Sequence, residues 1–188
     1  MIDLNNPEMI GPYDPVANWK RALIVRLAKY CHLHTFIETG TAQGDTIEAV
    51  KNAFINIFSI ELSSKLFNHA SNRFKNDITV RIFHGSSGDS LETIVNMAPL
   101  PALFWLDAHG TSDDLPGNGD QTEEELTTIV DLAPHSLVLI DDVKPLGDGW
   151  TSPDAPIKVP TGWTVRFLHG VLILHAGGLR YLGIPEVF

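Results

Sequence analysis

The sequence predicts an α/β fold in which a mostly parallel sheet carries helices on both faces. Short apolar stretches rich in Ile, Val, Leu and Phe alternate with segments whose apolar residues recur at helical spacing. This alternation is typical of crossover units that build a parallel sheet. The last two apolar stretches are separated only by Gly170, which is too short for a crossover, so they are expected to pair as an antiparallel hairpin.

The predicted elements follow one another along the whole chain. An irregular arm is expected over residues 1–13, and a helix with basic residues among its apolar positions from about Asp14 to Tyr30. Strands are expected at 34–39, 55–61, 78–84, 102–107, 136–141, 163–169 and 171–176. Helices are expected at 45–54, 63–74, 87–97 and 121–133. Two long irregular loops, at 109–120 and 142–162, are candidates for function because loops of this length are uncommon in compact domains.

Length and composition limit the class of protein. The chain has 188 residues, 44% of them hydrophobic, which fits one domain over residues 1–188 with a sizeable core. A formal charge of −10 argues against nucleic acid or an anionic membrane as a partner, because both need clustered Lys and Arg. Cys31 is the only cysteine, and the N-terminus lacks the pattern of a signal peptide, so we expect a cytoplasmic protein.

Acidic residues stand at the ends of four predicted strands. Glu38 ends the first strand, Glu61 the second and Asp107 the fourth, while Asp141 and Asp142 end the fifth. Ligands of open parallel sheets bind beyond the carboxyl ends of the strands. We therefore expect these carboxylates to form a polar site at one edge of the sheet.

A glycine-spaced turn follows Glu38. Gly40 and Gly44 permit tight backbone conformations, and the amides of Asp45 and Thr46 begin a helix. The G-x-x-x-G spacing lacks the third glycine of the dinucleotide fingerprint, and no phosphate-binding G-x-x-x-x-G-K-[ST] is present. Glu61, about twenty residues further on, is placed to bind ribose hydroxyls. Together these features favour an adenosyl ligand without phosphates.

The motif ETGTAQG, Glu61 and the closing hairpin resemble class I S-adenosylmethionine (SAM)-dependent methyltransferases over most of the chain. The resemblance implies a three-layer Rossmann-like fold whose seven strands are ordered 3-2-1-4-5-7-6, with the seventh antiparallel. It also implies that the turn from Glu38 to Gly44 holds the methionine part, Glu61 the ribose, and Gly85 to Ser87 the adenine. The implied SAM-binding residues are Glu38, Thr39, Gly40, Thr41, Gly44, Asp45, Thr46, Glu61, Leu62, Gly85, Ser86, Ser87 and Asp107.

The motifs WLDAHG and LIDDV are similar to the magnesium site of small-molecule O-methyltransferases of the catechol and macrocin types. That similarity implies Asp107, Asp141 and Asp142 as Mg²⁺ ligands. The cation would orient acceptor oxygens and favour ionisation of the attacking hydroxyl. The chain departs from the catechol pattern, which has Asp-Asn where Asp141-Asp142 stand here. It also has a Pro- and Gly-rich loop around Trp150, a residue expected to cover the acceptor, where the family has a helix.

These observations predict an enzyme that transfers a methyl group from SAM to an oxygen of a small-molecule acceptor, assisted by Mg²⁺. Asp107 and His109 are the candidate catalytic residues, with His109 as the general base. Three alternatives remain open: a metal-independent methyltransferase for nitrogen, carbon or oxygen, a non-catalytic SAM-binding module, and an NAD(P)-dependent oxidoreductase. The sequence identifies neither the acceptor nor the oligomeric state.

Overall fold

The computed structural model describes residues 15–108, 121–153 and 155–177. Its helices are α1 (Pro15–Tyr30), α2 (Asp45–Val50), α3 (Ser64–Arg73), α4 (Ser87–Met97) and α5 (Thr122–Leu132), and a 3₁₀ turn, η1 (Lys51–Ala53), follows α2. Its strands are β1 (Thr35–Thr39), β2 (Asn56–Glu61), β3 (Val80–His84), β4 (Ala102–Leu106), β5 (Leu137–Ile140), β6 (Lys144–Leu146), β7 (Gly149–Thr151), β8 (Pro156–Ile157), β9 (Trp163–Leu168) and β10 (Val171–Ala176).

The main sheet has seven strands in the order β3-β2-β1-β4-β5-β10-β9. The strands from β3 to β5 pair in parallel, and β10 is antiparallel to both of its neighbours. Because β9 and β10 are the sixth and seventh strands of this sheet in chain order, the predicted order 3-2-1-4-5-7-6 is confirmed. The terminal hairpin is confirmed as well.

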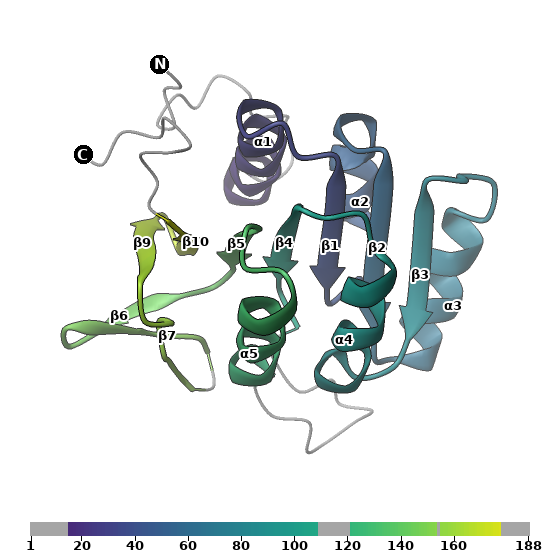
Figure 1. The fold of residues 1–188 in the computed structure, drawn as a ribbon. Coiled ribbons are helices and arrows are strands. Elements are labelled where there is room, and N and C mark those ends of the chain that lie inside the picture. The colour runs from purple at the N-terminus through teal and green to yellow at the C-terminus, as the bar shows by residue number, and fades with distance from the viewer. Residues whose placement is uncertain (1–14, 109–120, 154, 178–188) are drawn as a thin grey trace.

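Helices cover both faces of the sheet, as predicted. Figure 1 shows α4 and α5 in front of the sheet and α2 and α3 behind it. Successive side chains of a strand point to opposite faces. Thus Phe36 of β1 packs in the core with residues of α1 and α2, whereas its neighbour Ile37 packs with residues of α4 and α5. This alternation also decides which polar residues at the strand ends share a face.

The segment 142–162, expected to be an irregular loop, instead contains a second sheet of three antiparallel strands, β6-β7-β8. These strands are only two or three residues long, so they are too short to show an alternating pattern in the sequence. Trp150 of β7 stacks on Phe167 of β9, with 4.7 Å between the ring centroids. The ring thus packs against the main sheet on the face that α4 and α5 cover, and its role as a cover for the acceptor stays a prediction.

Two further expectations concern segments outside the described residues, namely the arm over 1–13 and the loop over 109–120, which includes His109. Among the helices that are described, none combines the length and the apolar character needed to cross a membrane.

Candidate active site

The acidic strand ends meet at one edge of the sheet, on one face. In the strand register Glu38 lies beside Ser59 and Trp105, and the Asp141 amide donates to the carbonyl of Leu106 (3.0 Å). Glu38, Glu61, Asp107 and Asp141 stand an even number of residues from core residues beneath α1 and α2. Side-chain alternation therefore directs all four toward the α1 side.

The glycine turn is held in the left-handed backbone region at alternate residues. Gly40, Ala42 and Gly44 have φ angles of 83°, 48° and 81°. A Cβ on Gly40 would lie 2.4 Å from the carbonyl oxygen of Asp107, so the turn packs directly on the exit of β4. A Cβ on Gly44 would lie 2.5 Å from the Phe74 ring, so the close approach at Gly44 is to α3. Both glycines are thus required by local packing.

Glu61 is buried and ties two turns together. Its Oε2 accepts a hydrogen bond from the Ala42 amide (2.7 Å), and its Oε1 accepts one from the Ser63 amide (2.8 Å). Each carboxylate oxygen has a further lone pair available for a ligand hydroxyl. The carboxylate is therefore fixed in place at the position that the resemblance assigns to ribose.

Glu38 is fully buried beside a chain of hydroxyls. The Ser59 hydroxyl donates to Oε2 of Glu38 (2.7 Å), and Thr41 Oγ1 lies 2.6 Å from the same hydroxyl. Burial raises the pKa of Glu38 to about 8. The Ser59 hydrogen bond opposes the rise, the negative charges of Asp107 and Glu61 add to it, and the Arg21 charge opposes it. The Glu38 carboxyl is therefore largely protonated at neutral pH.

The variant Glu38→Gln tests this protonation state. Because the pKa of Glu38 rises from 4.5 to about 8 on folding, wild-type stability falls by up to about 5 kcal/mol between those pH values. The glutamine oxygen still accepts from Ser59 but does not ionise. The free energies of unfolding should coincide at pH 4.5, and the variant should be the more stable at pH 8.5. Equal stability of the two proteins at pH 8.5 in urea titrations would contradict the assignment.

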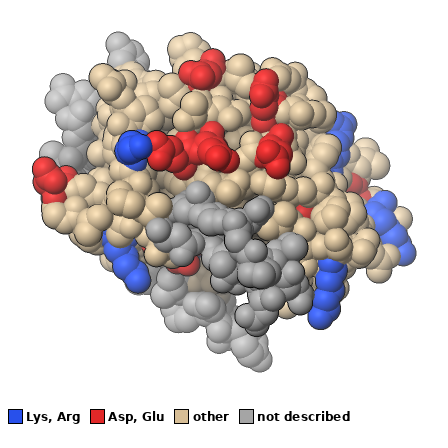
Figure 2. Space-filling model, turned by 90° about the horizontal axis from the view of Figure 1, so that it is seen from below, with Lys and Arg blue, Asp and Glu red and all other residues tan. Residues whose placement is uncertain are grey.

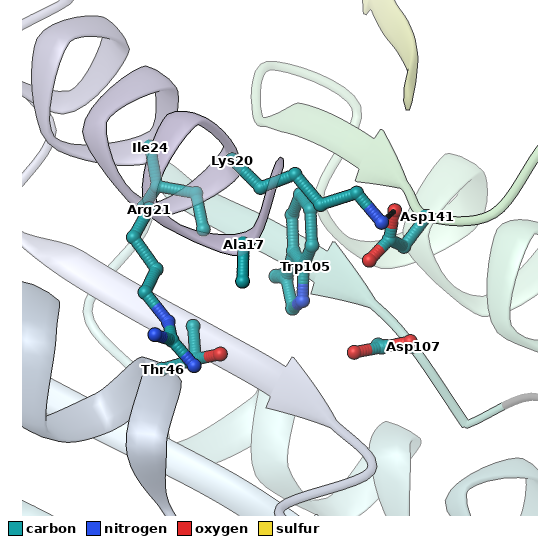
Figure 3. A pocket seen from close by; sticks show the side chains of 8 residues that line it. All are labelled: Ala17, Lys20, Arg21, Ile24, Thr46, Trp105, Asp107 and Asp141. Carbon is teal, nitrogen blue, oxygen red and sulfur yellow. Dashed lines mark ion pairs between the residues drawn. The ribbon is translucent and has the colours of Figure 1, made fainter. Parts of the chain in front are cut away.

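A pocket of about 180 Å³ lies between α1 and this edge of the sheet. Figure 3 shows the indole nitrogen of Trp105 turned toward the gap between Thr46 and Asp107, with Arg21 reaching down beside Thr46. Trp105 is 2% exposed, and within the described part of the chain its Nε1 has no hydrogen-bond partner. Arg21 likewise has no hydrogen bond or ion pair with a described residue. Two donors thus face the pocket without an acceptor.

The sequence did not single out Trp105 and Arg21, which the structure places in the pocket lining. Trp105 stands in a continuous apolar run, a pattern typical of core residues that carries no information about the indole N–H. Arg21 lies among other basic residues of an amphipathic helix, and only the packing of α1 singles it out. One signal was available in the sequence. Trp105 and Asp107 are two residues apart at the end of a strand, so their side chains point to the same face of the sheet.

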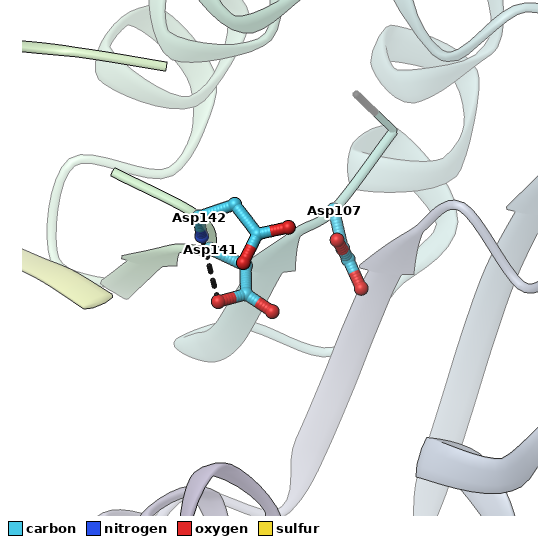
Figure 4. A group of neighbouring side chains, drawn as sticks. All are labelled: Asp107, Asp141 and Asp142. Atoms are coloured by element: carbon cyan, nitrogen blue, oxygen red, sulfur yellow. Dashed lines mark hydrogen bonds between the residues drawn. The ribbon is translucent and has the colours of Figure 1, made fainter. Parts of the chain in front are cut away.

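Asp107, Asp141 and Asp142 do converge (Figure 4). One carboxylate oxygen from each lies within 4.8 Å of the others. The Asp142 amide donates to Oδ1 of Asp141 (2.7 Å), and Asp142 has a φ of 51°, a left-handed conformation that aspartate tolerates better than most residues. The predicted acidic cluster is therefore present in the structure.

Lys20 of α1 contacts this cluster, which the sequence did not reveal. Its Nζ lies 2.6 Å from Oδ1 of Asp141 and 3.0 Å from Oδ1 of Asp142. Burial raises the pKa of Asp141, and the Lys20 charge opposes that rise. Burial also disfavours the charge on Lys20, but its two acidic partners hold the pKa above its ordinary value. The Lys20 ammonium thus already provides a positive charge next to the acidic cluster.

The donor set by itself fits Mg²⁺. Carboxylate oxygens are the ligands this ion prefers, and two ligands at about 2.1 Å from one ion stand at most about 4.2 Å apart. The carboxylate oxygens of the three aspartates lie within 4.8 Å of one another, so they need to move only slightly closer to bind one ion. Any ion held there would, however, share Asp141 and Asp142 with the Lys20 ammonium.

The remaining predicted residues fall into two groups. Thr39, Thr41 and Asp45 already have protein partners: Thr39 Oγ1 accepts from the Asp107 amide, Thr41 pairs with Ser59, and Asp45 pairs with Arg73 at the surface (2.7 Å). Leu62, Gly85, Ser86 and Ser87 lie around the exits of β2 and β3. Ser86 donates to Gln121 of α5 (3.1 Å), while the buried Ser87 hydroxyl has no partner among the described residues.

Comparison with known proteins supports the fold assignment. No protein-family model matches the sequence, and no curated protein matches it by sequence. A putative caffeoyl-CoA O-methyltransferase from Staphylococcus aureus aligns over 90% of this chain and 87% of its own, with 16% identity and a TM-score of 0.63. The S-adenosylhomocysteine (SAH)-bound Podospora anserina methyltransferase PaMTH1 aligns over 91% and 81%, with 15% identity and a TM-score of 0.63.

The O-methyltransferase TomG from Streptomyces achromogenes, solved in complex with SAM, aligns over 72% of this chain with 19% identity and a TM-score of 0.53. The aligned region spans 58% of the length of TomG. At these identities the likeness establishes a shared fold. The chain therefore has the Rossmann-like fold of these methyltransferases, as the resemblance implied.

Proposed function

We propose that this chain transfers the methyl group of SAM to an oxygen of a small-molecule acceptor. The observation that carries the proposal is the pocket beneath α1, where Arg21 and Trp105, two donors with no acceptor among the described residues, stand beside the Asp107 carboxylate. Cationic and N–H donors next to a carboxylate complement a free α-amino acid group, which has one charge of each sign. SAM presents such a group at the end nearest its reacting sulfonium.

This position of the amino acid group determines where the other parts of SAM would lie. The carboxylate of SAM would accept from Arg21, Trp105 Nε1 and Thr46, and its ammonium would contact Asp107. Glu61 would accept from the ribose hydroxyls. Leu62, Gly85, Ser86 and Ser87, whose hydroxyl has no partner in the described part of the chain, would border the adenine. Gly40 and Gly44 would shape the turn between these parts.

In the reaction an acceptor oxygen attacks the methyl carbon while the carbon–sulfur bond breaks, and SAH leaves as a neutral thioether. The acceptor hydroxyl gives up its proton, for which His109 remains the proposed base. Such a displacement depends mainly on alignment of donor and acceptor and on exclusion of water. A divalent cation, held by Asp107, Asp141 and Asp142, would supply a Lewis acid that lowers the pKa of the acceptor hydroxyl.

A second form of the function is metal-independent methyl transfer. It is favoured by Lys20, whose ammonium contacts two of the three carboxylates. Turnover that persists in a chelator would support this form, and turnover restored only by Mg²⁺ would support the first.

The surface charge argues against a polyanionic acceptor. Figure 2 views the molecule from below and shows Asp and Glu side chains gathered on this face, with Lys and Arg mostly at its margins. A negative surface disfavours polyanions such as nucleic acid. We retain the prediction of a small-molecule acceptor on this ground.

Binding of SAH to the purified chain tests the proposal directly. At a concentration of 100 Kd, SAH should raise the free energy of unfolding by about 2.7 kcal/mol. In Arg21→Met the Kd for SAH should rise at least about tenfold, because a charge-assisted hydrogen bond is lost. The control Lys29→Met removes the same charge from the exposed end of α1 and should leave the Kd unchanged. Absence of SAH binding by calorimetry would refute the proposed function.

A further inference from the structure

A sheltered ion pair joins the first helix to the acidic cluster. Lys20 and Asp142 are 122 residues apart in sequence, yet Nζ of Lys20 reaches both aspartates after β5. The Lys20 and Asp141 side chains are only 15% and 7% exposed. Contacts this sheltered are little weakened by salt and need good geometry to compensate for desolvation.

The surroundings of Lys20 hold it in this position. The preceding residue, Trp19, packs edge-on against the ring of His169 in the turn between β9 and β10, with 5.1 Å between the centroids. Next to that turn, the Val143 amide donates to the carbonyl of Gly170 (2.8 Å). The start of α1, the terminal hairpin and the exit of β5 are therefore fixed to one another, and the ammonium is directed at Asp141 and Asp142.

We propose that Lys20 is a built-in cation that takes the place of the divalent metal ion in this acidic cluster. The ammonium neutralises part of the charge of the three carboxylates and contacts one oxygen of Asp141 and one of Asp142, two of the three residues that an incoming ion would need. A divalent ion must either displace Lys20 from its two partners or accept its repulsion at short range. Lys20 thereby keeps Asp141 and Asp142 in position without an exchangeable metal.

This inference rests on the second form of the proposed function, methyl transfer without a metal, and only for its consequence. The competition between ammonium and metal is a property of the folded chain alone. It can therefore be measured without SAM or an acceptor, and failure of one proposal leaves the other testable.

Mn²⁺ binding, followed by electron paramagnetic resonance and calorimetry, tests the inference. The wild-type chain should bind Mn²⁺ weakly, and Lys20→Met should bind it at least about tenfold more tightly, because a nearby positive charge is gone and two carboxylates are released. The gain should disappear in the double variant Lys20→Met, Asp142→Asn. The matched control is Lys51→Met, since Lys51 also pairs with two carboxylates, those of Glu48 (3.1 Å) and Asp77 (3.7 Å), and this variant should not change Mn²⁺ affinity.

Two results would overturn the inference. The first is that the wild-type chain binds Mn²⁺ with micromolar affinity and that Asp141→Asn abolishes this binding. This result can be obtained without any Lys20 variant. The other is a folded Lys20→Met, verified by circular dichroism, whose Mn²⁺ affinity equals that of the wild type. Lys20→Arg, which keeps the charge, provides a second variant and should stay as weak a Mn²⁺ binder as the wild type.

Discussion

Gly40→Ala is expected to destabilise the protein by about 3 kcal/mol or more and to abolish SAH binding. A left-handed backbone costs a non-glycine residue about 1–2 kcal/mol, and the new Cβ would press on the Asp107 carbonyl oxygen, which lies in backbone that cannot rotate away. Relief of this contact must move either the turn or the exit of β4, and both line the proposed cofactor site. Thermal unfolding should show a loss on the order of 10 °C.

Gly162→Ala is the matched control. Gly162 has a φ of 81°, close to that of Gly40, but its added Cβ would meet nothing within 4 Å. It should therefore show the backbone cost alone and retain SAH affinity. Similar losses of stability in the two variants would contradict the packing argument for Gly40.

Asp107→Asn is expected to weaken SAH binding by about tenfold to a hundredfold, because a charged partner of the cofactor ammonium becomes neutral at almost constant shape. The effect should depend on the amino acid end of the ligand. 5′-Methylthioadenosine lacks that end and should bind wild type and variant equally. Both ligands can be compared by calorimetry on the same preparations.

Asp142→Asn provides the contrast, since the Asp142 side chain is 61% exposed and lies outside the pocket lining. Its SAH affinity should match that of the wild type. An equal loss of SAH and methylthioadenosine binding in Asp107→Asn would indicate a general disturbance of the site, and the assigned contact with the ammonium would be rejected.

Much of the fold was predictable because its signals are local. Strands such as β4 and β5 are continuous apolar runs, and the short turn of His169 and Gly170 between β9 and β10 leaves room only for a hairpin. The short strands β6 to β8 gave no such signal, because two or three residues cannot display a period. They are formed by pairing with one another, for example Trp150 with Ile157, and pairing of this kind is invisible in composition.

The candidate site was predictable where it depends on strand ends and only partly elsewhere. Parallel strands must bring Glu38, Glu61 and Asp107 to one edge, so their convergence follows from topology. The cations of the site could not be predicted in this way. Lys20 and Arg21 are two of several basic residues on an amphipathic helix, and their roles arise from where α1 docks on the sheet.

That docking joins the beginning of the chain to its middle. α1 leaves the ribosome long before β4 and β5, so Lys20 lacks its partners Asp141 and Asp142 until more than a hundred residues have followed. Contacts between such distant segments form late, since a long loop must close first. Occupancy of the pocket by a ligand would consequently report that synthesis has passed β5 and that α1 has docked on the strands that line the pocket.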